Sequence, residues 1–128
     1  MEAPRPLTLE EISEAHSVAY VYDVMELRQA NGHGTSDAET ARTLPHTSGA
    51  MLAAAREALR NGRVAVAPVS GFHHAGYASG YGYCTFNGLA IVAATLAGEG
   101  VRVGILDFDA HPGDGTQEII DVLGLDTP

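Results

Sequence analysis

The chain has no lysine, no tryptophan and one cysteine among its 128 residues. Its 7 basic residues are all arginine and face 16 acidic ones, so the formal net charge is −9. This charge disfavours nucleic acid and anionic membranes as partners, whereas it suits a basic substrate. The lone Cys84 cannot form an internal disulfide, which favours a reducing compartment and a role as a small buried residue.

Long apolar runs are also missing. No stretch approaches the length of a membrane span, and the first six residues contain no signal-peptide core, so we expect a cytoplasmic protein. The length suggests one domain. Basic charge carried only by arginine, together with abundant alanine, favours a bacterial source.

Apolar periodicity and turn residues predict an α/β chain. Thr8 and Glu11 form a capping-box pattern, and Asn87 is a helix-cap candidate. Residues 31–47 indicate a loop, in which His33 and His46 are expected to be exposed. The expected helices cover about 17–29, 48–60, 87–98 and 115–123, and the expected strands cover 63–68 and 101–107. This alternation predicts a three-layer αβα arrangement around a parallel sheet, with the loops after the strands at one edge.

The most informative segment follows the second of these strands. Asp107, Asp109 and His111 are spaced two apart, so in an extended chain their side chains would share one face. Placing three ionisable groups together in this way is electrostatically unfavourable without a cation. Carboxylate and imidazole ligands suit Zn²⁺, our first choice, and also Fe²⁺.

Two further segments carry chemistry. The adjacent His73 and His74 follow a short apolar run and could transfer protons if carboxylates orient them. Residues 80–87 are rich in glycine and aromatics, as in a loop that lines an apolar channel.

In this order and spacing, the three segments resemble the histone deacetylase and acetylpolyamine amidohydrolase superfamily, which has the arginase–deacetylase fold. The shared elements are His73-His74-Ala75, the Gly-aromatic-Cys-x-x-Asn element at residues 82–87, and the Asp-x-Asp-x-His-x-Gly-x-Gly element at residues 107–115. The clear match covers about residues 64–118, and a fainter one reaches back to about residue 14. The resemblance implies that the whole chain, 1–128, is the N-terminal part of a catalytic domain, with a possible substrate rim at 31–47.

The resemblance also implies catalytic roles. His73 and His74 match the tandem histidines that activate a metal-bound water and protonate the leaving amine. Asp107 matches the carboxylate behind the first histidine, and Asp114 matches the one behind the second. Such carboxylate–histidine pairs fix the tautomer and raise the basicity of the ring.

Binding roles follow in the same way. Asp109 and His111 match two of the family's three metal ligands. Asp107, Asp109 and His111 also match a structural monovalent-cation site for K⁺ or Na⁺. Gly82 and Tyr83 match the backbone and aromatic wall that grip an extended acyl-lysine-like arm.

Taken together, the resemblance implies a metal-dependent deacetylase that acts on an N-acetylated lysine or polyamine. Its third metal ligand and its transition-state tyrosine would follow Pro128, so the chain is expected to need the rest of the domain, a partner chain or oligomerisation. A non-catalytic, truncated deacetylase-like module is one alternative. A more distant one is a haloacid dehalogenase-type phosphatase, because Asp107-x-Asp109 after an apolar strand resembles its nucleophile motif.

Overall fold

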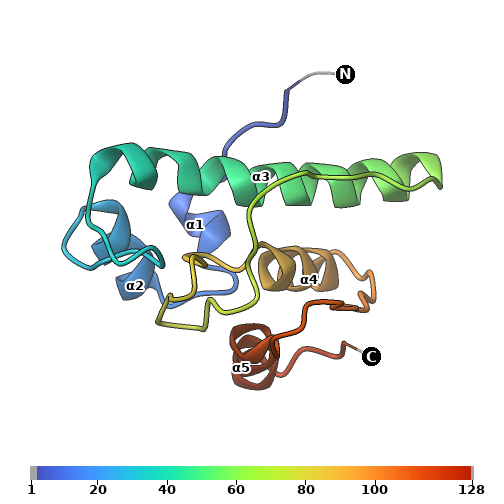
Figure 1. The fold of residues 1–128 in the computed structure, drawn as a ribbon. Coiled ribbons are helices and arrows are strands. Elements are labelled where there is room, and N and C mark those ends of the chain that lie inside the picture. The colour runs from blue at the N-terminus through green and yellow to red at the C-terminus, as the bar shows by residue number, and fades with distance from the viewer. Residues whose placement is uncertain (1–2, 128) are drawn as a thin grey trace.

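The structure is a computed structural model that describes residues 3–127, and these contain five helices (Figure 1). The long α3 crosses one side, α4 lies next to it and α5 lies beyond α4, while α1 and α2 pack at one end. The helices are α1 (Leu9–Ile12), α2 (Val18–Met25), α3 (Ala38–Asn61), α4 (Gly88–Gly98) and α5 (Asp114–Leu123). None of the described helices is long and apolar enough to cross a membrane.

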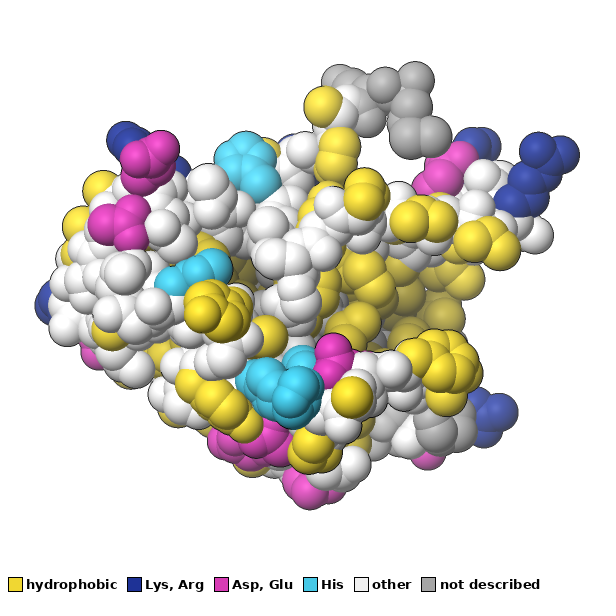
Figure 2. Space-filling model, in the orientation of Figure 1, with side chains coloured by type: hydrophobic (Ala, Val, Ile, Leu, Met, Phe, Trp, Pro, Cys, Tyr) yellow, Lys and Arg dark blue, Asp and Glu magenta, His cyan; other side chains and the backbone are white. Residues whose placement is uncertain are grey.

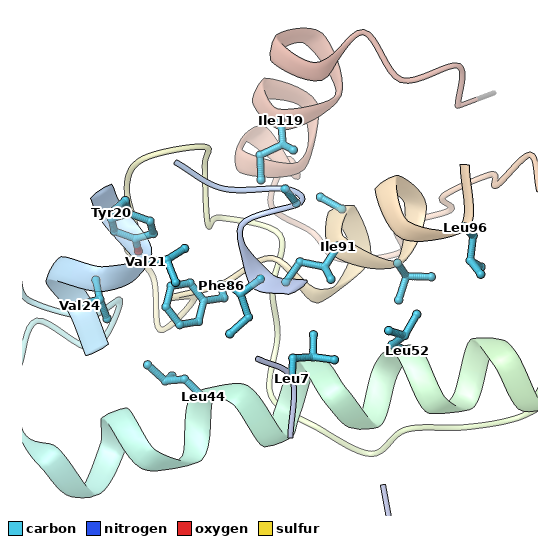
Figure 3. Close-up of a cluster of buried hydrophobic side chains, with 14 residues drawn as sticks. Leu7, Tyr20, Val21, Val24, Leu44, Leu52, Phe86, Ile91, Leu96 and Ile119 are labelled. Carbon is cyan, nitrogen blue, oxygen red and sulfur yellow. The ribbon is translucent and has the colours of Figure 1, made fainter. Parts of the chain in front are cut away.

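The core is built around α4. This helix is apolar on nearly every side, and both Ile91 and Leu96 are buried against the neighbouring elements. Figure 3 shows these side chains between α3 and α5, with Phe86 and Val21 at the end near α2. Because α4 is the central layer, the loop that precedes it is held from several sides.

Two of the predicted helix boundaries hold closely. The capping box is present, because Thr8 accepts a bond from the Glu11 amide and Glu11 accepts one from the Thr8 amide. Asn87 caps α4 by accepting a bond from the Ala90 amide at 3.1 Å. Helix α2, in contrast, ends at Met25, several residues before the predicted end at 29. Leu27 has a positive φ of 63°, which stops the helix.

The prediction of a loop over 31–47 is wrong for its second half. Residues 38–47 form the first turns of α3, capped by Asp37, which accepts a bond from the Thr40 amide at 2.7 Å. Pro45 lies inside this helix and is buried, and its carbonyl accepts a bond from the Leu7 amide at 3.1 Å. This bond ties the crossing N-terminal segment to α3 at the buried proline. His46 is exposed, as expected, but lies on this helix and not in a loop.

The two predicted strands, 63–68 and 101–107, have no regular helix or ladder, so the parallel sheet is not seen within residues 3–127. The pairing found there is one isolated bridge between Tyr81 and Cys84. Strands need neighbours for their backbone groups, and these two segments do not pair with each other. Their apolar side chains are left in the open: Val64 is 91% exposed and Phe108 is 89% exposed.

A hydrophobic cleft accompanies these segments. It has a volume of about 640 Å³ and lies between α3 and residues 64–68. Figure 2 shows the hollow with an apolar floor on the face viewed, beside the half of α3 that ends at Asn61. Apolar surfaces of this kind are typical of places where another element, a partner or a ligand packs.

We predict that the two valines of α2 respond differently to the same truncation. Val21 is fully buried, so Val21→Ala should lower the free energy of unfolding by about 2 kcal/mol. Val18 is 60% exposed, so Val18→Ala should change it by less than about 0.5 kcal/mol. Urea unfolding of both variants in the complete protein tests this. Equal losses would contradict the assignment of the core face of α2.

Candidate active site

The candidate active site lies where three loops meet. The first loop, between α3 and α4, carries His73 and His74. The second is residues 107–113, which lead into α5, and the third is the turn at 80–84. Histidine side chains gather beside acidic ones on the lower part of the face in Figure 2. The motifs recognised in the sequence therefore converge in space.

Each of the tandem histidines is paired with its own carboxylate. His73 Nδ1 lies 2.8 Å from Asp107 Oδ2, and His74 Nδ1 lies 2.7 Å from Asp114 Oδ1. The two rings are neighbours, with centroids 4.2 Å apart. With Nδ1 engaged in each ring, Nε2 is the atom left to exchange a proton with a bound molecule.

The carboxylates of this site are held as anions. The Asp109 amide and the His73 ring lower the pKa of Asp107. Hydrogen bonds from His74 and then from Tyr81 lower the pKa of Asp114 to about 2. Both aspartates are therefore ionised near neutral pH, which is the state in which they orient an imidazole N–H.

The Asp-x-Asp-x-His segment is organised by local turns, not by the shared face of a strand as predicted. The amide of Asp109 donates to Asp107 Oδ1 at 2.9 Å, and the amide of His111 donates to Asp109 Oδ1 at 2.8 Å. Such bonds from a carboxylate to a backbone amide two residues later form Asx turns. These turns hold residues 107–111 without a ladder, and within them the His111 ring contacts the Asp109 carboxylate.

Asp109 and His111 have the donor atoms that a divalent cation needs. Asp109 Oδ1 and His111 Nδ1 lie 3.0 Å apart, within hydrogen-bond distance of each other. Carboxylate oxygen and imidazole nitrogen are both ligand types that zinc accepts, so these two residues could supply two ligands. Within residues 3–127, no group of three or more histidine, cysteine, aspartate or glutamate side chains could hold a metal ion. The K⁺ or Na⁺ site at Asp107, Asp109 and His111 stays a prediction.

The turn at 81–84 forms the rim of the site. Its central residues Gly82 and Tyr83 both have positive φ, 57° and 65°, and Cys84 donates back to the Tyr81 carbonyl at 2.9 Å. A side chain at Gly82 would meet the His74 ring, since its Cβ would lie 2.7 Å from His74 Cδ2. Glycine is therefore required here both for conformation and for the close approach to the histidine.

Tyr83 points outward from this turn. It is 74% exposed and contacts the His33 ring edge-on, with centroids 5.6 Å apart. The amide of Tyr83 donates to the Gly32 carbonyl at 2.9 Å, which ties the 31–35 loop to the rim. A depression of about 360 Å³ lies between this loop and residues 80–83. Cys84 is buried behind the turn, and burial raises the pKa of its thiol.

A buried polar network supports the histidine loop and includes His16 and Thr116, to which no sequence motif had pointed. Asn87 donates through Nδ2 to the Ala75 carbonyl and to Thr116 Oγ1, both at 2.9 Å. His16 receives the Asn87 amide on Nε2 at 2.8 Å and contacts the Gly76 carbonyl through Nδ1 at 2.9 Å. The faint match around residue 16 was the only signal for this support.

The ends of this network meet the histidine loop and α5 directly. The amide of Thr116 donates to the His73 carbonyl at 3.0 Å. A Cβ at Gly115 would lie 2.5 Å from the Ala75 carbonyl, so α5 can approach this loop only with glycine there. Helix α5 therefore brings Asp114 to His74 by packing against the same loop.

The convergence of all three motifs on one site matches a known domain. The histone deacetylase domain family matches residues 1–122. The chain belongs to this family.

Relatives of this histone deacetylase family member are found among archaea. A probable deacetylase of Archaeoglobus fulgidus is 35% identical over 127 residues, covering 91% of this chain and 34% of the relative. A probable deacetylase of Methanothermobacter thermautotrophicus is 37% identical over 120 residues, covering 87% and 36%. The chain thus spans about a third of the length of the curated relatives it matches.

Solved structures of the family superpose on the chain. An HDAC homologue from Aquifex aeolicus gives a TM-score of 0.80 at 27% identity, covering 91% of this chain and 35% of the other. An HDAC homologue complexed with SAHA gives a TM-score of 0.78 at 29% identity, with the same coverage of both chains. The observed arrangement of helices and loops is therefore the deacetylase fold, of which this chain forms a part.

We predict that His16 makes the stability of the protein depend on pH. Burial lowers the pKa of His16 to about 4, whereas the unfolded value is about 6.5. Between about pH 6.5 and pH 4, His16 is protonated in the unfolded state but not in the folded state. The free energy of unfolding should therefore fall by about 3 kcal/mol as the pH drops through this range. Denaturant unfolding at several pH values measures this fall.

Two variants separate this effect from other titrations. His16→Gln should be less stable at neutral pH and should lose most of the dependence between pH 6.5 and 4. His46→Gln removes an exposed histidine and should keep the dependence. The same slope in His16→Gln as in the parent protein would refute the assignment.

Proposed function

We propose that the protein carrying this chain is a metal-dependent deacetylase that hydrolyses the amide of an N-acetylated lysine or polyamine. The observation that carries the proposal is the pair of adjacent His–Asp couples, His73–Asp107 and His74–Asp114, directly beside Asp109 and His111. Two oriented imidazoles next to a pair of metal-ligand types suit amide hydrolysis by a bound water.

The histidines would handle the protons. Hydrolysis forms a bond between the water oxygen and the acyl carbon and breaks the bond from that carbon to nitrogen. The water gives up one proton and the departing amine gains one. His73 and His74 each keep Nδ1 on a carboxylate, so their Nε2 atoms can accept the first proton and deliver the second.

Asp109 and His111 would hold the metal, zinc by first choice and Fe²⁺ as the other candidate. When bound, such a cation supplies polarisation of the amide carbonyl and lowers the pKa of a nearby water. Family resemblance supports a third ligand, an aspartate, and a transition-state tyrosine in the part of the relatives that this chain does not span.

The rim would select the substrate. Gly82 lets the chain pass close to His74, and the exposed Tyr83 ring offers a wall for an extended arm. The net charge of −9 favours a positively charged carrier of the acyl group. One structural relative is complexed with SAHA, which supports a ligand-binding site in this fold.

The predicted three-layer αβα architecture is proposed for the complete deacetylase that carries this chain. We infer that residues 63–68 and 101–107 become strands when the remaining chain supplies their neighbours. Their open apolar side chains and the cleft beside α3 support this, because such surfaces are stable when covered. A cytoplasmic location remains part of the same proposal.

The alternatives have less support. The phosphatase motif needs Asp107 as a free nucleophile, whereas this carboxylate is bonded to His73 and to the Asp109 amide. A non-catalytic module would have no use for two carboxylate–histidine couples in one site. The deacetylase proposal uses all of these groups.

We predict that His74→Ala in the complete protein lowers kcat for an acetyl-lysine substrate by at least about 100-fold, because it removes a proton-transfer group. Steady-state hydrolysis of a fluorogenic acetyl-lysine peptide and of an acetylpolyamine measures this. His46→Ala, which removes an exposed histidine on α3, is the matched control and should retain activity. Near-normal turnover in His74→Ala would overturn the assigned role.

We further predict that Asp109→Ala and His111→Ala each remove most of the bound zinc or iron, because each takes away one ligand. Elemental analysis of the purified protein gives the metal content per chain without reference to activity. His33→Ala removes an exposed histidine outside this ligand pair and should keep the metal content unchanged. Equal metal content in all three variants would contradict the ligand assignment.

A further inference from the structure

Tyr81 makes two contacts with one of the two His–Asp couples, and neither the sequence motifs nor the proposed mechanism uses them. Its hydroxyl donates to Asp114 Oδ2, the carboxylate oxygen that His74 leaves free. Its ring is stacked on the His74 ring, with centroids 4.9 Å apart and an angle of 30° between the planes. Tyr81 therefore touches both members of the couple at once.

We propose that Tyr81 is a positioning residue that holds the Asp114 carboxylate and the His74 ring in their working orientation. The role of His74 in turnover rests on the proposed function, whereas the contacts themselves do not. Because one oxygen of Asp114 is bound by the phenol and the other by the imidazole, the carboxylate plane is fixed at both ends.

The second couple shows what this contact replaces. Asp107 is also bound through both oxygens, by His73 at Oδ2 and by the Asp109 backbone amide at Oδ1. The phenol of Tyr81 thus does for Asp114 what a backbone amide does for Asp107. A backbone donor is built into the turn, whereas a side-chain donor can be removed by one substitution, so the two couples can be told apart experimentally.

The turn holds Tyr81 in place for this task. Tyr81 pairs with Cys84 in the isolated bridge, and its carbonyl accepts the Cys84 amide at 2.9 Å. Gly82, next in the chain, has no Cβ to push the His74 ring away. The turn that leaves Tyr83 exposed at the rim therefore also places the Tyr81 ring against the His74 ring.

Three variants separate the contacts. Tyr81→Phe keeps the stacked ring and removes the hydrogen bond, and Tyr81→Leu removes both. Tyr22→Phe removes the hydroxyl of a tyrosine on α2, whose only partner is Glu10 at 3.4 Å among the described residues, and serves as the control. Thermal unfolding of each variant confirms that the comparison is made between folded proteins.

The first readout is independent of activity. The side chains of His73 and His74 are 12% and 16% exposed, so their Nδ1-bound protons are protected from exchange with water. These protons can be followed by NMR in protein with isotope-labelled histidine. With the phenol gone, Asp114 becomes a stronger acceptor, so Tyr81→Phe should move the His74 proton signal downfield and leave the His73 signal in place. No movement, or equal movement of both signals, would overturn the proposal.

The second readout is the split between kcat and KM. Tyr81→Phe should lower kcat about tenfold, which corresponds to one hydrogen bond, and leave KM unchanged. Tyr81→Leu should lower kcat further, and Tyr22→Phe should lower neither. A kcat in Tyr81→Phe equal to that of the parent enzyme would refute the positioning role. If the parent protein hydrolyses no acylated amine, the proposed function fails, and the NMR signals alone decide whether Tyr81 holds the couple.

Discussion

The site depends on the side chain of Asn87. The side-chain amide caps α4 and donates to the Ala75 carbonyl and to Thr116 on α5. The backbone N–H of Asn87 donates to the His16 ring. Each of these partners lies in a different part of the chain, and all are buried. Because a buried polar group is costly to leave unpaired, the network specifies one arrangement of the histidine loop.

That arrangement determines the chemistry available. Once the backbone of the histidine loop is fixed against α5, Asp114 at the start of α5 reaches His74 with no long loop to order. His73 meets Asp107 from the other side, where Asx turns hold the carboxylate. The two couples are similar in distance but differ in their second donor, a backbone amide in one and the phenol of Tyr81 in the other.

Several elements could be predicted because their signals are local. The capping box at Thr8 and the cap at Asn87 depend on residues three positions apart, and the helix 87–98 depends on an apolar run. The predicted loop at 31–47 was wrong where a proline suggested a break. Pro45 instead lies buried inside α3, where the N-terminal segment crosses and the Leu7 amide donates to its carbonyl, a contact that no local pattern reveals.

The sequence by itself determined the residue types of the site, since the order and spacing of the three motifs are covalent facts, and from them the family. Only the tertiary structure decided that Asx turns and not a strand organise residues 107–111, and that Tyr81 and His16 support the site. The physical reason is separation along the chain. His16 and Asn87 lie 71 residues apart, and Tyr81 and Asp114 lie 33 apart, so their contacts arise from packing and not from local spacing.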